Sequence, residues 1–156
     1  MISEIIIAAE SVGIKPIVTN SKEKSKEFTR NLETQLNRLT GIEELPAMLI
    51  SWDYETLITF DSNGFIKPPS TNIVALLMTK AEGREKVEME LASGEMGTLF
   101  IEFVKVLNSN LKTIIRMNED ENPVTGISML NTPSHGAGKH SGVLGKFNIL
   151  SKVNNC

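Results

Sequence analysis

The sequence predicts an α/β fold of the α+β kind: a mixed or antiparallel sheet of about four to five strands flanked by two long helices. Two long segments, residues 21–39 and 84–107, repeat apolar residues at helical spacing. Apolar runs of strand length, bounded by turn residues, occur between and after them. With 156 residues, of which 40% are hydrophobic and 22% charged, the chain can bury one sizeable core. We therefore expect a single domain over residues 1–156.

Residues 1–20 are expected to form an N-terminal extension with a short helix. Ser3 can cap this helix and Gly13 can end it. An extended piece follows over residues 14–18, because Pro16 disfavours helical backbone in the residue before it. The residues that would share the apolar face of the helix are Ile2, Ile5, Ile6, Ala9 and Val12.

The first long helix is predicted over residues 21–39. Asn20 and Glu23 resemble a capping box at its start, and Gly41 would stop it. Charged residues occupy its other faces, so we expect a surface helix with one narrow buried stripe. The stripe consists of Phe28, Leu32, Leu36 and Leu39.

A β-rich segment follows the first long helix. Apolar runs over residues 47–52 and 55–60 precede an Asn-Gly turn at residues 61–64, which suits a tight hairpin. The next strand is predicted over residues 72–79. Its central residues are apolar on both sides, which indicates burial on both faces of the sheet.

The second long helix is predicted over residues 84–107, with an extension to Leu111 left open. Gly94 and Gly97 each weaken it by about 1 kcal/mol relative to alanine. They would mark a kink, a break into two helices or a close helix crossing. The predicted apolar stripe consists of Val87, Leu91, Leu99, Phe103, Val106 and Leu107.

The last segment again predicts β-structure. Strands are expected at residues 112–117, 124–130 and 143–150. Residues 131–142 are polar and rich in glycine, and we expect them to form a mobile loop.

Charge and cysteine usage exclude several classes of protein. Sixteen Lys and Arg against 19 Asp and Glu give a net charge of −3, which disfavours a nucleic-acid or membrane-surface binder. The single cysteine, Cys156, excludes a disulfide within the chain and nearly excludes a cysteine-ligated zinc site.

The apolar run over residues 5–9 is too short to span a bilayer and lacks the basic start of a signal peptide. We expect a protein of the reducing cytosol, or of an assembly built there, with no cofactor and no membrane partner.

Residues 133–142 hold a Gly-Lys pair between glycines, which invites a phosphate-binding interpretation. A P-loop needs glycine five positions earlier and Ser or Thr directly afterwards, where this sequence has Pro133 and His140. His135 and His140 could share a metal ion, but the sequence places no cysteine or carboxylate nearby to complete the ligand set. We expect neither a nucleotide nor a metal. His135, Lys139 and His140 are instead candidates to contact a neighbouring protein.

The predicted hairpin supplies a second candidate contact. Phe65 and Ile66 follow the Asn-Gly turn and precede Pro68, which puts apolar side chains where solvent is expected. Exposed apolar groups of this kind often mark a partner site. Folding back onto the core is equally consistent with the sequence.

No catalytic constellation can be read from the sequence. A Gly-x-Ser-x-Gly elbow is absent. The carboxylate groups at residues 43–44 and 119–121 lie in predicted polar turns, where solvated charges are the usual state. We therefore expect that the protein is not an enzyme.

The predicted order of elements is a short helix, followed by helix, strand, strand, helix, strand and strand. Two further features matter: the segment 45–50 directly after the first long helix, and the closing strand at residues 143–150. In this order the chain resembles the tail-terminator group of tailed bacteriophages, small α/β proteins that cap or complete the tail. The resemblance implies a structural virion protein that forms a ring, commonly a hexamer, on the tail tube beneath the head–tail connector. Assembly would take place in the host cytoplasm. Such families share almost no invariant residues, so no functional residue is carried over.

The sequence departs from that group in its N-terminal hydrophobic helix and its long Ser/His/Gly loop. These departures leave open another neck, connector or tail role. A small cytosolic protein-binding adaptor is an alternative with nearly the same features. A ligand-binding domain or an enzyme would need a pocket with convergent polar groups. Self-association separates these classes, because a tail terminator should form closed rings whereas an adaptor need not.

Overall fold

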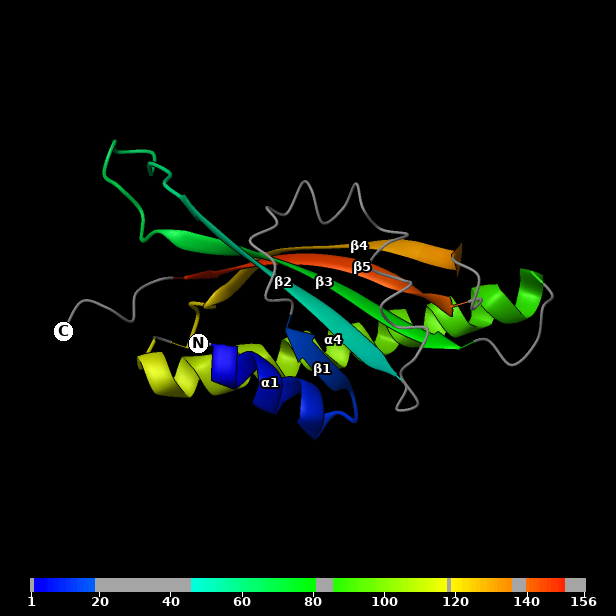
Figure 1. The fold of residues 1–156 in the computed structure, drawn as a ribbon. Coiled ribbons are helices and arrows are strands. Elements are labelled where there is room, and N and C mark those ends of the chain that lie inside the picture. The colour runs from blue at the N-terminus through cyan, green and yellow to red at the C-terminus, as the bar shows by residue number, and fades with distance from the viewer. Residues whose placement is uncertain (1, 19–45, 81–85, 118, 136–139, 151–156) are drawn as a thin grey trace.

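The computed structural model describes residues 2–18, 46–80, 86–117, 119–135 and 140–150 (Figure 1). Its mixed five-stranded sheet and two helices confirm the predicted α+β class. The predicted helix over residues 21–39 lies outside the described residues. The described elements are α1 (Ile2–Ser11), β1 (Lys15–Val18), β2 (Ala47–Leu57), β3 (Ser70–Lys80), α4 (Lys86–Ile115), β4 (Val124–His135) and β5 (His140–Leu150).

The strands lie in the order β1-β2-β3-β5-β4. The short strand β1 pairs parallel with β2, and every other pairing is antiparallel. The four-residue β1 and the twelve-residue β4 are therefore the edge strands. Two hairpins, β2–β3 and β4–β5, supply most of the sheet.

The centre of the sheet is buried on both faces. Along β3, alternate residues belong to two separate apolar clusters, and residues 73–78 are fully buried, as their sequence predicted. The first cluster also contains residues of α1 and α4, so these helices cover that face. The second cluster comprises Ala47, Leu49, Val74, Leu76, Met78 and Leu144.

Three phenylalanines form the centre of the helix–sheet layer. The ring centroids of Phe100, Phe103 and Phe147 lie 5.9 to 6.2 Å apart in tilted and edge-on arrangements. Gly145 of β5 faces Phe100, where an added Cβ would lie 2.1 Å from the ring. The absent side chain therefore lets α4 lie close against β5.

Helix α4 runs unbroken past both central glycines, so the break into two helices, one of the three alternatives left open there, does not occur. Gly97 packs against Val143 of β5, with 3.7 Å between its ideal Cβ position and the valine methyl, so its close neighbour is a strand and not a second helix. The strand predicted at residues 112–117 is wrong, since residues up to Ile115 continue the helix. Leu111 is buried at the same helical spacing as Leu107, and this packing overrides the β-propensity of the residues that follow.

The predicted loop over residues 131–142 is shorter than expected. Residues 131–135 extend β4 and residues 140–142 begin β5, with Thr132 opposite Gly142 and His135 opposite His140. Residues 136–139 lie outside the described part of the chain. Neither described helix is long and apolar enough to cross a membrane.

Candidate functional site

The connection between β2 and β3 is an ordered hairpin that projects from the sheet (Figure 1). Asp61 organises its end: one carboxylate oxygen accepts hydrogen bonds from the amides of Asn63 and Phe65 at 2.8 and 2.9 Å. The Asp61 amide donates to the Phe65 carbonyl at 2.8 Å, and Phe60 and Ile66 form a β-bridge. Gly64 has the positive φ of 82° expected of the Asn-Gly turn.

This ordered hairpin holds large apolar side chains in solvent. Phe65 and Ile66 are 70% and 66% exposed, so they do not fold back onto the core. Ile58 and Phe60 beside them are also exposed. We call these four residues the apolar tip. Because the turn is fixed by hydrogen bonds, the exposure of the tip is a property of the fold and not of a loose loop.

A second apolar surface lies on the outer face of α4. Val87 and Leu91 are each 63% exposed, contrary to their predicted place in the buried stripe. With Gly94 they line a shallow groove of about 440 Å³. Its other lining residues are Glu90, Glu95 and Thr98, and we call the whole the α4 groove.

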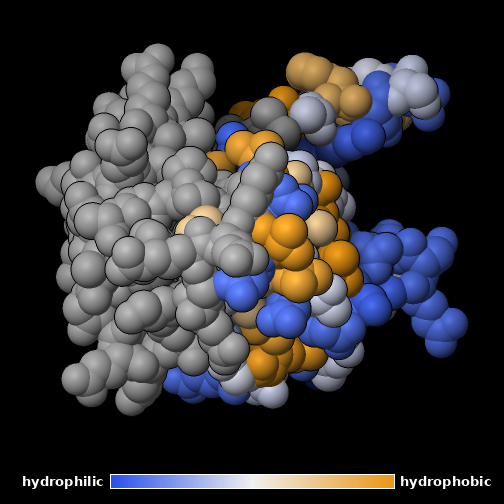
Figure 2. All heavy atoms as spheres, turned by 90° about the vertical axis from the view of Figure 1, so that its right-hand side faces the viewer, coloured by the Kyte–Doolittle hydropathy of each residue, from blue (hydrophilic) through white to orange (hydrophobic). Residues whose placement is uncertain are grey.

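The apolar tip and the α4 groove lie at opposite ends of the molecule. In Figure 1 the hairpin projects at the upper left, whereas α4 begins at the right. Figure 2 looks onto the end at which α4 begins, and hydrophobic side chains form a band among hydrophilic ones on the described part of that face. The two surfaces of one copy therefore lie far apart on the molecule (Figure 1).

The edge strand β4 exposes a third set of apolar side chains. Ile127, Met129 and Leu130 are exposed on a strand whose outer edge pairs with no other described strand. The pairing of β4 with β5 shifts register between Thr125 and Ser128. An irregularity of this kind bends an edge and hinders regular edge-to-edge pairing.

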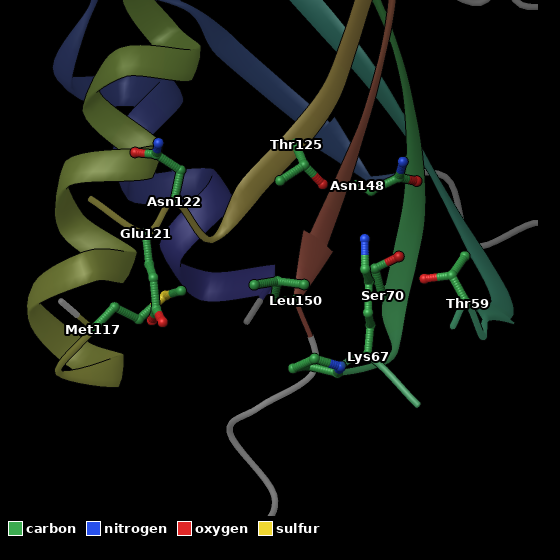
Figure 3. Close-up of a pocket in the computed structure, with 10 residues that line it drawn as sticks. Thr59, Lys67, Ser70, Met117, Glu121, Asn122, Thr125, Asn148 and Leu150 are labelled. Carbon is green, nitrogen blue, oxygen red and sulfur yellow. The ribbon is translucent and has the colours of Figure 1, made fainter. Parts of the chain in front are cut away.

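An open pocket of about 620 Å³ lies at the base of the hairpin (Figure 3). Lys67, Ser70 and Thr59 line one side of it, and Met117 and Glu121 lie on the α4 side. Its remaining lining residues are Pro68, Asn122, Thr125, Asn148 and Leu150.

One polar atom of this pocket lacks a partner. Within the described part of the chain, the buried Oδ1 atoms of Asn148 and of Asn72, its partner in the β3–β5 pairing, accept no hydrogen bond. A buried side-chain oxygen without a hydrogen-bond partner is uncommon in folded proteins. The sequence reasoning missed this pocket, because its residues come from four separated segments.

The candidate histidines lie away from the tip. His135 and His140 are directly opposite each other where β4 ends and β5 begins. The nearby Gly142 carbonyl accepts a 2.7 Å hydrogen bond from Ser93 of α4, which places this end of the ribbon beside the first half of that helix. Lys139 lies outside the described residues, and the described residues contain no cluster of three or more metal-ligating side chains.

No protein-family model matches the chain, and no curated protein matches its sequence.

Proposed function

We propose that this chain is a structural virion protein of a tailed phage, which forms a ring as a tail terminator or tail-completion subunit at the head–tail junction. The resemblance in element order supports the phage assignment. The paired apolar surfaces support the ring. The proposed partners are further copies of this chain, commonly six in all by the resemblance, together with the tail tube and the connector or neck proteins.

The observation that carries the ring proposal is the position of the apolar tip and the α4 groove at opposite ends of one copy. A ring with cyclic symmetry needs heterologous contacts, in which one patch of a subunit meets a different patch of the next. Two unlike apolar patches at opposite ends of one copy (Figure 1) are compatible with that requirement. In this role assembly takes place in the host cytoplasm and the finished protein resides in the virion.

The first test is the mass of the purified chain by light scattering, with negative-stain images of the same sample. Closed rings are expected, either directly or after addition of purified tail tubes. A chain that stays monomeric at high concentration and does not bind tail tubes would contradict the proposal. That result would favour the adaptor or another neck role.

A second candidate function is the binding of a small polar molecule in the pocket at the base of the hairpin. The lining favours it, because Lys67, Glu121 and Asn148 stand among apolar side chains, and pockets of this size that bind ligands place a few polar groups against an apolar lining. Native mass spectrometry of the purified chain tests it. A stoichiometric small molecule that is lost in Asn148→Leu would support ligand binding, whereas a bare chain would count against it.

A further inference from the structure

We propose that the apolar tip of one copy docks into the α4 groove of the next copy. This inference rests on the proposed self-assembly and names its contact. The tip projects from the sheet and presents two aromatic and two aliphatic side chains, and the shallow groove offers Val87 and Leu91 as apolar lining. Aromatic anchors seated in pockets supply most of the binding energy of typical protein interfaces.

Gly94 is the first observation that points to an occupant. A glycine inside a helix costs about 0.8–1 kcal/mol relative to alanine. Nothing within 4 Å of its ideal Cβ position requires the glycine, whereas Gly97 and Gly145 each face a packed side chain. The absence of a side chain at residue 94 keeps the groove open between Val87, Leu91 and Thr98. A large side chain from another molecule can therefore approach the helix backbone there.

Charge is the second observation that points to the hairpin of another copy. The described charged residues of the groove are Glu90 and Glu95, both exposed and both acidic. The residue directly after the tip is the exposed Lys67. Seating Phe65 in the groove brings this cation to an acidic rim, which favours the register and orientation of the contact.

Disulfide trapping tests the contact directly. In a Cys156→Ser background, Ser62→Cys places a thiol on the turn and Thr98→Cys places one at the groove, and both positions are exposed. Oxidation of the mixture should give a covalent dimer containing one chain of each variant. Each variant oxidised alone should give far less. A mixture of Ser62→Cys with Glu10→Cys, on the exposed side of α1, is the matched control.

A charge swap supplies an independent readout. Lys67→Glu and Glu95→Lys should each weaken self-association by about ten-fold, and the double variant should recover most of the loss. No recovery, or no trapped dimer above the Glu10→Cys control, overturns the docking contact. If wild-type rings form despite such a result, the ring proposal stands and only the contact fails. If the chain forms neither rings nor trapped dimers, both proposals fail.

Discussion

Two glycines, Gly145 and Gly94, differ in the space that surrounds their missing side chains. At residue 145 a Cβ would lie 2.1 Å from the ring of Phe100, which is fully buried among other aromatic rings. At residue 94 a Cβ would meet nothing. The same residue type therefore serves the packing of α4 on the sheet at one position and leaves a surface open at the other.

Gly145→Ala is expected to destabilise the fold by about 1–3 kcal/mol, because the extra methyl group overpacks the aromatic cluster. Gly94→Ala is the matched control and should raise the free energy of unfolding by up to about 1 kcal/mol through helix propensity. Urea unfolding of both variants measures the two effects. Equal effects of the two substitutions would contradict the close approach of β5 to Phe100.

Asp61 is the residue on which the shape of the apolar tip depends. Asp61→Ala removes the acceptor of the Asn63 and Phe65 amides, so both amides should exchange with deuterium faster, while the free energy of global unfolding changes by less than about 1 kcal/mol. Asp61→Asn keeps an acceptor oxygen and should retain most of the protection. Unchanged exchange in Asp61→Ala would show that the bridge between Phe60 and Ile66 holds the turn by itself.

At the scale of elements, the sequence predicted the strands better than the faces of α4. The runs at residues 47–52, 72–79 and 143–150 are mostly apolar and of strand length, and each lies in a strand of the sheet. Val87 and Leu91 fit the helical period but lie outside, because the buried side of α4 is set by Phe100, Phe103 and Leu107 facing the sheet. The helical spacing of apolar residues predicts a helix, but it does not show which of those residues face the core when apolar residues lie on more than one side.

Long-range pairing explains the other errors. Residues 131–135 are polar, and their low strand propensity predicted a loop. They continue β4 because β5 lies beside them and supplies backbone partners, a contact that no short window of sequence contains. Phe65 and Ile66 could be named as candidates from their place beside an Asn-Gly turn, whereas their exposure depends on how far the hairpin projects.

Two positions on α4 test which face of the helix is buried. Phe103→Ala should destabilise the fold by about 3–5 kcal/mol, since it removes a fully buried ring from the aromatic cluster. Ile101→Ala lies two residues away with a 42% exposed side chain, and should cost less than about 1.5 kcal/mol. Thermal unfolding of the pair provides the measurement. Comparable losses would place the helix in a different rotation about its axis.

For the whole molecule, the docking of unlike surfaces determines what mixtures of variants form. Phe65→Ser disables the tip and leaves the groove intact, while Leu91→Asp disables the groove and leaves the tip intact. Both side chains are largely exposed, at 70% and 63%, so neither change should unfold the chain. In a contact between identical patches, tip on tip or groove on groove, one of the two variants would still dimerise by itself, because it keeps that patch intact. In a contact between unlike patches, the intact tip of the Leu91→Asp variant meets the intact groove of the Phe65→Ser variant.

The mixture is therefore expected to stop at a heterodimer of one chain of each variant. Each variant alone should be monomeric, because it lacks one of the two surfaces, and the dimer formed in the mixture has no further intact pair with which to grow. Sedimentation velocity of the separate and mixed samples measures this. Ile7→Ser, an exposed apolar position on α1, should assemble like the unchanged chain. Larger oligomers in the mixture, or dimers of either variant alone, would require a contact other than tip against groove.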